Sequence, residues 1–341
     1  MNYIYIFAIP LIIYFVNTFI SHKGFLPSLS GEKHQLFVEK KNVPLSGGII
    51  IVIIFLFIEK FNIDFYFLFL FLIFCIGFFS DLKKITSPRN RFFMQIISIF
   101  FFVIFYNFHI SSVRISVIDF LLEYKFFSYF FVIFCLLIII NGTNFIDGLN
   151  GLVLGYFISI LIVIYNLQLF ENLNITQFQI LCFIELLFFL LIFNFFNKLY
   201  IGDGGSYLLG FGFGILLIAL YETNNFISPF FIVLLLWYPC FENLFSILRK
   251  YRFNLSPLNS DNKHFHQLLF YFIKKKFKLS ALVSNNLCSI LINIFNILTL
   301  SIGALDIFDT QLQILVIFFN VIFYVYIYIR LFNYRFKKTK I

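Results

Sequence analysis

The sequence predicts an all-α polytopic integral membrane protein, and three observations support this fold class. Of the 341 residues, 61% are hydrophobic and only 12% are charged, so the chain carries far more apolar surface than a soluble core requires. The apolar residues form segments that approach the roughly 20 residues a helix needs to cross a bilayer. The basic residues lie almost entirely in alternate loops between these segments. We therefore expect one transmembrane domain over residues 1–341 instead of several globular domains.

Eleven apolar segments are predicted to be transmembrane helices. They comprise residues 3–20, 45–58, 65–79, 92–108, 126–140, 151–167, 178–196, 206–221, 226–245, 281–302 and 308–332. No basic residue precedes the first segment, and the first lysine, Lys23, follows it. A cleaved signal peptide has the opposite arrangement, so this segment is predicted to be a span with the N-terminus outside. An odd number of spans then places the C-terminus in the cytoplasm.

The distribution of basic residues supports this orientation. With the N-terminus outside, 22 of the 25 Lys and Arg lie on the cytoplasmic side, and only Lys60, Arg114 and Lys125 lie outside. An excess of positive charge on one side is the pattern that orients membrane proteins. The net charge of +9 therefore needs no nucleic-acid partner. The five cysteines lie within apolar runs and form no CxxC pair, so disulfides and zinc sites are not expected.

Polar clusters at four helix ends all fall on the predicted cytoplasmic side. They surround Asp81, Asp147, Asp203 and His264, whereas eight of the 16 Asp and Glu lie in predicted external loops. Carboxylates at membrane depth are costly and usually mark function. For one such residue alone, a helix cap or a structural hydrogen bond is an equally good explanation. Three carboxylates on one face favour a functional site.

The residue types in these clusters indicate the chemistry. Oxygen ligands without cysteine suit Mg²⁺, which proteins hold by one or two side chains together with substrate phosphates. Asp203 lies in IGDGGS, where glycines can leave backbone N–H groups free to bind a phosphate, although the same pattern also makes turns. The large cytoplasmic loop at 246–280 carries eight basic residues, and the lysines at 274–276 suit anionic lipid headgroups. Candidate substrate contacts in this loop are Arg249, His264 and His266.

Five motifs follow one another along the chain: GFFSDLKKITSPRNRFFMQ, NGTNFIDGLNGL, NKLYIGDGGSYLLGF, WYPCFENLFSILRK and SDNKHFHQLL. In residues and order they resemble the polyprenyl-phosphate N-acetylhexosamine-1-phosphate transferases, also called glycosyltransferase family 4. The resemblance covers roughly residues 40–270. It includes VPLSGG at 43–48, which is similar to the family's Thr-Pro-x-x-Gly-Gly with Val43 in place of Thr.

The resemblance implies a reaction at the inner leaflet of the bacterial inner (plasma) membrane. A UDP-linked N-acetylamino sugar would give its sugar-1-phosphate to undecaprenyl phosphate and release UMP. The product would start a cell-surface polysaccharide of the O-antigen, exopolysaccharide or teichoic acid type. Besides these two substrates, the implied partner is membrane lipid, and a homodimer is left open.

The resemblance also assigns roles by motif. Asn144 and Asp203 correspond to the family's Mg²⁺ site, with Mn²⁺ as an alternative ion, and Asp81 and Asp147 correspond to active-site carboxylates. The implied substrate-binding residues are Asn150, Arg249, His264 and His266. Direct attack by the lipid phosphate is favoured over a covalent aspartyl-phosphate on Asp81 or Asp147, which would require a two-step kinetic signature.

Three positions depart from the family's pattern. Ser80 stands where many members have the first of two aspartates, a carboxylate proposed to deprotonate the lipid phosphate. A phosphate monoester is already largely ionised at pH 7, because its second pKa is about 6, so the nucleophile does not depend on this base. Asn150 replaces the second Asp of the usual DGxDGL. The histidine loop reads His-Phe-His-Gln, unlike the triple-histidine pattern of the peptidoglycan translocase.

Three alternative functions stay open at this level. The first is the phospho-MurNAc-pentapeptide transferase of peptidoglycan synthesis. The second is a secondary transporter, which would place its ionisable residues near the membrane midplane on broken helices and not at one face. The third is a catalytically inactive member of the family, which Ser80 and Asn150 make plausible.

Overall fold

The computed structural model describes residues 3–26, 43–58, 65–173, 175–224, 226–252, 254, 256 and 262–336. Within these ranges the helical elements are 14 α-helices and one short 3₁₀ helix, as expected for an all-α fold. Most of the predicted cytoplasmic loop at 21–44 lies outside the described residues, as does Asp261 of the histidine-loop motif.

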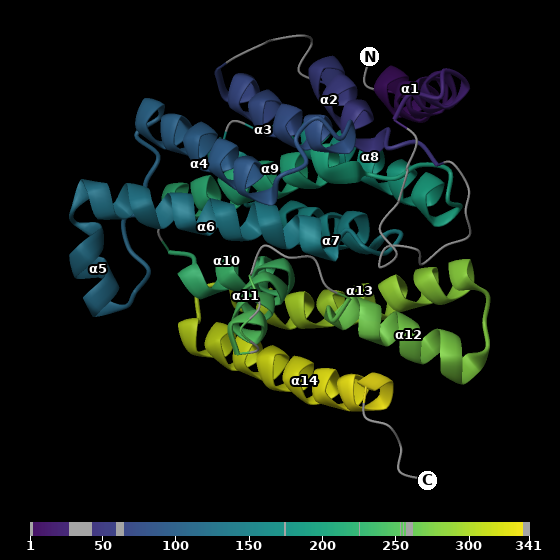
Figure 1. Ribbon diagram of the computed structural model, residues 1–341. Coiled ribbons are helices and arrows are strands. Elements are labelled where there is room, and N and C mark those ends of the chain that lie inside the picture. Colours follow the sequence, from purple (N-terminus) through teal and green to yellow (C-terminus); the bar gives the residue numbers. More distant parts are fainter. Residues whose placement is uncertain are drawn as a thin grey trace.

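Most of the helices coincide with predicted segments (Figure 1). The helices are α1 (Tyr3–His22), α2 (Gly47–Ile58), α3 (Phe65–Asp81), α4 (Pro88–Phe105), α5 (Ser116–Leu122), α6 (Lys125–Ile146), α7 (Leu152–Asn166), η1 (Glu171–Leu173), α8 (Gln177–Phe195), α9 (Gly202–Thr223), α10 (Pro229–Leu235), α11 (Trp237–Arg252), α12 (Phe265–Phe277), α13 (Ala281–Gly303) and α14 (Thr310–Phe336). Of these, α5 and α12 lie in predicted loops. Among the described residues, six helices are long and apolar enough to span a membrane, or seven with the bent pair α10–α11. Four further apolar helices are shorter. The count of eleven spans and the external N-terminus therefore stay predictions.

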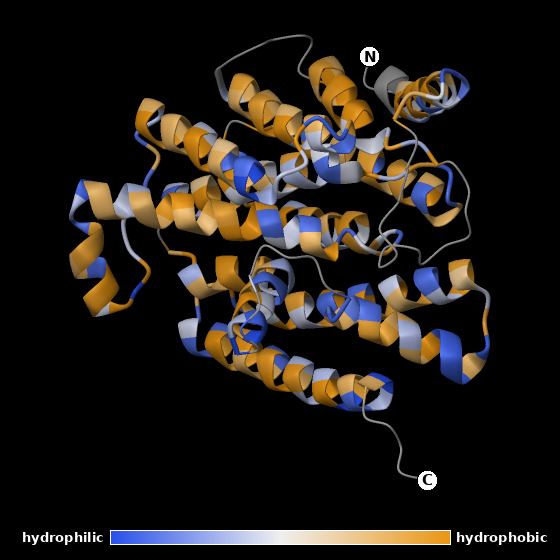
Figure 2. Cartoon of the chain, in the orientation of Figure 1, coloured by the Kyte–Doolittle hydropathy of each residue, from blue (hydrophilic) through white to orange (hydrophobic). Residues whose placement is uncertain are grey.

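Local sequence signals explain where several helices begin. α4 begins at Pro88, whose missing N–H costs nothing in a first turn. At the start of α8, the Thr176 hydroxyl accepts a hydrogen bond from the Gln179 N–H (3.2 Å), and the Gln179 side chain accepts one from the Thr176 N–H (2.9 Å). Between their ends most helices are apolar over long stretches (Figure 2), as contact with lipid requires.

α9 is the most buried of the candidate spans, and it packs most extensively against α3 and α6. Glycines make this possible. A Cβ at Gly205 would lie 3.1 Å from the Cα of Gly48 on α2, and one at Gly210 would lie 2.8 Å from the Cα of Ile140 on α6. Small residues let helix backbones approach closely in a bilayer, where packing and not hydrophobic burial drives helix association. α9 therefore approaches α2 and α6 closely enough for their backbones to touch.

The predicted single span at 226–245 is in fact a bent pair. α10 and α11 meet at an angle of 78°. Pro239 in the first turn of α11 has no N–H to bond the carbonyl of Leu235, so the helical ladder is interrupted. The hydroxyl of Tyr156 on α7 donates to that carbonyl (2.8 Å) and satisfies it. The predicted loop at 246–280 is likewise partly helical, because α11 continues to Arg252 and α12 occupies Phe265–Phe277.

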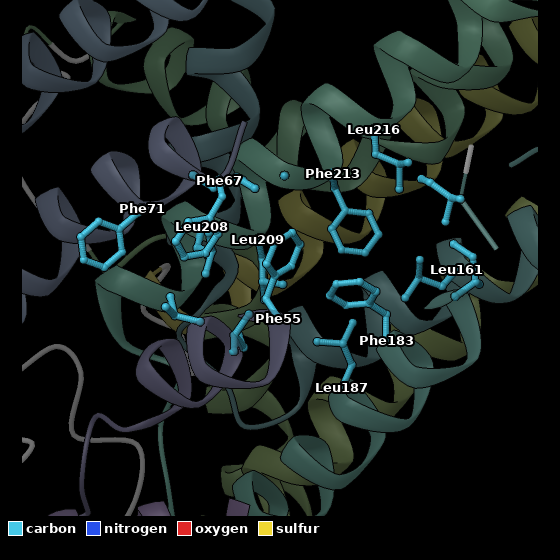
Figure 3. Close-up of a pocket in the computed structure, with 16 residues that line it drawn as sticks. Phe55, Phe67, Phe71, Leu161, Phe183, Leu187, Leu208, Leu209, Phe213 and Leu216 are labelled. Atoms are coloured by element: carbon cyan, nitrogen blue, oxygen red, sulfur yellow. The ribbon is translucent and has the colours of Figure 1, made fainter. Parts of the chain in front are cut away.

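An apolar cavity of about 190 Å³ lies between α2, α3, α7, α8 and α9 (Figure 3). Phe55, Phe183 and Phe213 project into it from three of these helices. Gly212 forms part of its wall, and a Cβ there would meet only the Cδ2 of Leu70, at 3.5 Å. The lining side chains are all apolar, so this cavity does not share the chemistry of the polar helix ends.

Candidate functional site

The predicted site residues lie on helix ends and not in open loops. Asp81 is the last residue of α3, Asn144 lies in the last turn of α6, and Asp203 lies in the first turn of α9. The predicted spans end at residue 140 and resume at 151, but α6 continues to Ile146, so the first part of this interval is helical. The Asn141 amide is satisfied on that helix, where it donates to the Leu137 carbonyl (2.9 Å) and to Gln95 of α4 (3.0 Å).

Asp81 caps the N-terminus of α9 from the neighbouring helix. Its Oδ1 accepts the N–H of Asp203 (2.9 Å) and its Oδ2 accepts the N–H of Gly204 (3.0 Å). The first N–H groups of a helix are unpaired and carry partial positive charge, so a carboxylate is stabilised there. Gly202 has φ +74°, and a Cβ on it would lie 2.6 Å from Asp81 Oδ2. The expectation that the N–H groups of this motif are free to bind a phosphate is therefore wrong for these two.

Asp203 is held by donors from three helices. Its Oδ1 accepts from the Asn144 amide (2.7 Å), and its Oδ2 accepts from the Ser80 hydroxyl (2.7 Å) and from Arg91 (2.6 Å). Arg91 also donates to Ser80 (2.8 Å). Sequence reasoning did not single out Arg91, although it lies within the first motif. Arg91 lies in the first turn of α4, the helix that follows α3 along the chain. This position could have indicated that its side chain lies near Ser80 at the end of α3.

Asp147 directly follows α6 and adds a third carboxylate. Burial, and then the negative charges of Asp203 and Asp81, raise the pKa of Asp147 well above its usual value. When ionised, three carboxylates beside one arginine repel one another, and a cation bound there would relieve the repulsion. Among the described residues, no group of three or more His, Cys, Asp or Glu is arranged to hold a metal ion. The donor set fits Mg²⁺, which needs only one or two protein ligands beside water and phosphate.

The two histidines adjoin the turn that carries Asp147. The His264 ring lies 5.2 Å from the ring of Phe145 and 5.7 Å from that of His266, between centroids. A Cβ on Gly148 would lie 2.6 Å from His266 Nε2, so the histidine loop touches the residue after Asp147. His266 is fully buried, and neither ring nitrogen has a hydrogen-bond partner within the described ranges. Burial lowers the pKa of His266 to about 3, so its imidazole is neutral.

Arg249 and Asn150 make contacts within the protein. The buried Arg249 guanidinium donates to the Tyr328 hydroxyl (2.8 Å) and to the carbonyl of Lys263. The N–H of Asn150 donates to the side chain of Asn285 on α13 (2.8 Å). Both contacts attach the site to the C-terminal helices. The expected substrate contacts of Arg249 and Asn150 stay predictions.

The fold and these helix ends define a polytopic membrane protein with an acidic, histidine-bearing site at one end of its helix bundle. Residues 64–221 match the sequence profile of glycosyl transferase family 4. This match confirms the resemblance that the motifs indicated. The matched segment contains Asp81, Arg91, Asn144, Asp147 and Asp203, whereas the histidine loop lies beyond it.

Several curated proteins are similar to this chain over different lengths. A probable undecaprenyl-phosphate N-acetylglucosaminyl 1-phosphate transferase of Bacillus subtilis is 32% identical over 39% of this chain and 38% of its own length. The undecaprenyl-phosphate alpha-N-acetylglucosaminyl 1-phosphate transferase of Thermotoga maritima is 26% identical over 76% of this chain and 77% of its own. A phospho-N-acetylmuramoyl-pentapeptide-transferase of Streptococcus sanguinis is 30% identical over 40% and 44%. The matches to the Bacillus and Streptococcus proteins thus span less than half of those relatives.

Proposed function

We propose that this protein transfers an N-acetylamino-sugar-1-phosphate from a UDP-sugar to undecaprenyl phosphate in the bacterial plasma membrane. The observation that carries the proposal is the meeting of Asp81, Asn144 and Asp203 from three helices in one hydrogen-bonded cluster. Because this cluster contains carboxylates, it can bind two anionic substrates only together with cations. The similarity to named undecaprenyl-phosphate transferases supplies the substrate class.

The reaction is a phosphoryl transfer between two anions. An oxygen of the lipid phosphate attacks the phosphorus that bears the sugar, and a new P–O bond forms. The bond from that phosphorus to the bridging oxygen breaks, and its electron pair leaves with UMP. The protein's contribution to such a reaction is positioning and neutralisation of charge.

Different residues of the site would bind the metal ion and fix the positions of its ligands. Asp203 and Asn144 would hold Mg²⁺, the latter through its amide oxygen once the amide is turned over. When bound, the ion supplies charge stabilisation at the pyrophosphate. Arg91 fixes the orientation of the Asp203 carboxylate, and Asp81 fixes the start of α9 on α3. Because two N–H groups already bind the Asp81 carboxylate, direct attack by the lipid phosphate is favoured over an aspartyl-phosphate intermediate on Asp81.

The direct test is a reaction of purified protein with undecaprenyl phosphate and a panel of UDP-sugars, including UDP-MurNAc-pentapeptide. We expect UMP release together with a lipid product whose mass identifies the transferred amino sugar. Product from UDP-MurNAc-pentapeptide alone would assign the protein to the peptidoglycan reaction. Absence of any product with folded protein would favour a transporter or an inactive family member.

The structure also gives an expected result for restoring the missing carboxylate. Ser80→Asp places a second carboxylate beside Asp203 Oδ2, where the Ser80 hydroxyl now donates a hydrogen bond. Since both carboxylates would compete for Arg91 and would repel the anionic substrates, UMP release should fall by at least about tenfold.

Ser80→Ala is the matched control for that substitution. It removes the hydroxyl without adding charge, and it should reduce the rate less than Ser80→Asp does. A Ser80→Asp enzyme that is faster than wild type, most clearly below about pH 6, would show instead that a base at this position assists the lipid phosphate.

A further inference from the structure

Asp81, Asp147 and Asp203 together are called the acidic cluster below. Glu242 on α11 is a buried carboxylate outside this cluster, with an exposed fraction of 1%. Three donors surround it. Its Oε1 accepts from His264 Nδ1 (2.9 Å) and from the N–H of Phe265 (3.3 Å). Its Oε2 accepts from the hydroxyl of Tyr324 on α14 (2.6 Å). A buried charge with both oxygens satisfied holds its partners in one geometry, because loss of either contact leaves an unpaired polar group.

The histidine loop is bound to α14 by further contacts. The carbonyl of Lys263 accepts from the Tyr328 hydroxyl (3.0 Å) and from Arg249, and the carbonyl of Asn262 accepts from Arg335 (2.8 Å). Tyr328 and Arg335 therefore hold two consecutive residues of the loop from one helix, and Tyr324 of the same helix binds Glu242. α14 lies wholly outside the segment that matches the family profile.

We propose that Glu242, supported by Tyr324, is a positioning residue that keeps the proton of His264 on Nδ1. This inference rests on the proposed function for its catalytic consequence, but not for the pairing itself. With Nδ1–H committed to Glu242, a hydrogen bond between His264 and a substrate would have to be made by Nε2. A carboxylate that orients a histidine in this way selects its tautomer and its ring plane.

The orientation passes from α14 to the acidic cluster through ring contacts. The His264 ring lies nearly parallel to that of His266, with 18° between the planes, and His266 meets Gly148 beside Asp147. A rotation of the His264 ring would therefore disturb His266 and, through it, the contact with Gly148. The C-terminal helix thus takes part in assembling a site whose carboxylates all lie on other helices.

Glu242→Gln tests the pairing with almost no change in volume. The amide has one acceptor oxygen, so its nitrogen must face either His264 or Tyr324, and His264 is expected to move its proton to Nε2. We expect kcat/KM for the UDP-sugar to fall about 10- to 100-fold with folded protein. Tyr324→Phe removes only the second donor and should cause a smaller loss. The double variant should lose no more than Glu242→Gln alone, because both changes act through one carboxylate.

Histidine ¹⁵N chemical shifts in lipid nanodiscs give a readout that does not depend on activity. In the wild type we expect the His264 signal of an Nδ1-protonated ring, and in Glu242→Gln that of an Nε2-protonated ring. Glu222→Gln is the matched control, since Glu222 accepts from the backbone and hydroxyl of Ser111 far from this site, and it should change neither signal nor rate.

The outcomes distinguish the pairing of Glu242 with His264 from the proposed transferase function. An unchanged His264 signal in both Glu242→Gln and Tyr324→Phe overturns the positioning role, whatever the activity. A changed signal in a protein that releases no UMP supports the pairing and rejects the proposed function. If Glu242→Gln does not fold, the wild-type signal decides: an Nδ1-protonated His264 ring supports the pairing, and an Nε2-protonated ring rejects it.

Discussion

Replacing Asp203 with asparagine should lower the rate of UMP release by about 10²- to 10³-fold while the protein stays folded. In the structure both oxygens of Asp203 accept hydrogen bonds, from Asn144 on one side and from Ser80 and Arg91 on the other. An amide must present its NH₂ group to one of these donor sets, and it also removes the negative charge that would attract Mg²⁺. The assay is UMP release over a range of Mg²⁺ concentrations, with thermal unfolding as the measure of folding.

Asp306→Asn is the control for this substitution. Asp306 is exposed before α14, where its Oδ1 accepts from the N–H groups of Phe308 and Asp309. An asparagine oxygen can accept the same bonds, so the rate should not change. If Asp203→Asn retains nearly normal activity and the same Mg²⁺ requirement as Asp306→Asn, Asp203 does not belong to a metal site.

Gly77→Ala should abolish activity and destabilise the folded protein. A Cβ at Gly77 on α3 would meet the carbonyl of Asp203 and would lie 2.5 Å from the nitrogen of Gly204. These are backbone atoms at the start of α9, so no side-chain rotation can make room, and α3 must move away. Overpacking of this kind typically costs about 1–3 kcal/mol. The same displacement would pull Asp81 from the two N–H groups that it caps.

Gly212→Ala on α9 is the matched control for this substitution. Its Cβ would meet only Leu70 Cδ2 at 3.5 Å, beside the apolar cavity, so both the unfolding temperature and the rate should stay near those of the wild type. The two variants are compared by thermal unfolding in detergent and by UMP release. Equal effects of Gly77→Ala and Gly212→Ala would contradict the close contact between α3 and α9.

Most of the helices could be predicted, because a bilayer imposes a length and a composition on every helix that crosses it. The meeting of Asp81, Asp147 and Asp203 could also be predicted, since the predicted orientation of the spans places these three helix ends on one side. The hydrogen bonds that these residues make could not be predicted. Nothing in GDGGS shows that its N–H groups are taken by Asp81, because that contact joins residues more than 120 positions apart.

Beside the histidine loop, the sequence contained a signal that the prediction did not use. Glu242 lies inside the predicted span at 226–245, and an ionisable residue within a span usually marks function. Its partners could not be read from the chain, because Tyr324 follows it by 82 positions. The bend that turns α11 is visible as Pro239, but the hydroxyl of Tyr156 that satisfies the freed carbonyl is set by tertiary packing alone.

The glycine contacts and the apolar cavity divide α9 into a stiff part and a compliant part. Near Asp203 its neighbours touch it through backbone atoms, which have no rotamers to adjust, whereas the cavity further along is walled by side chains that can repack. We therefore expect a change in bilayer thickness or lateral pressure that bends the surrounding helices to be taken up mainly at the cavity. The carboxylates should then keep their spacing, and the geometry required by the proposed phosphoryl transfer should be insulated from the state of the membrane.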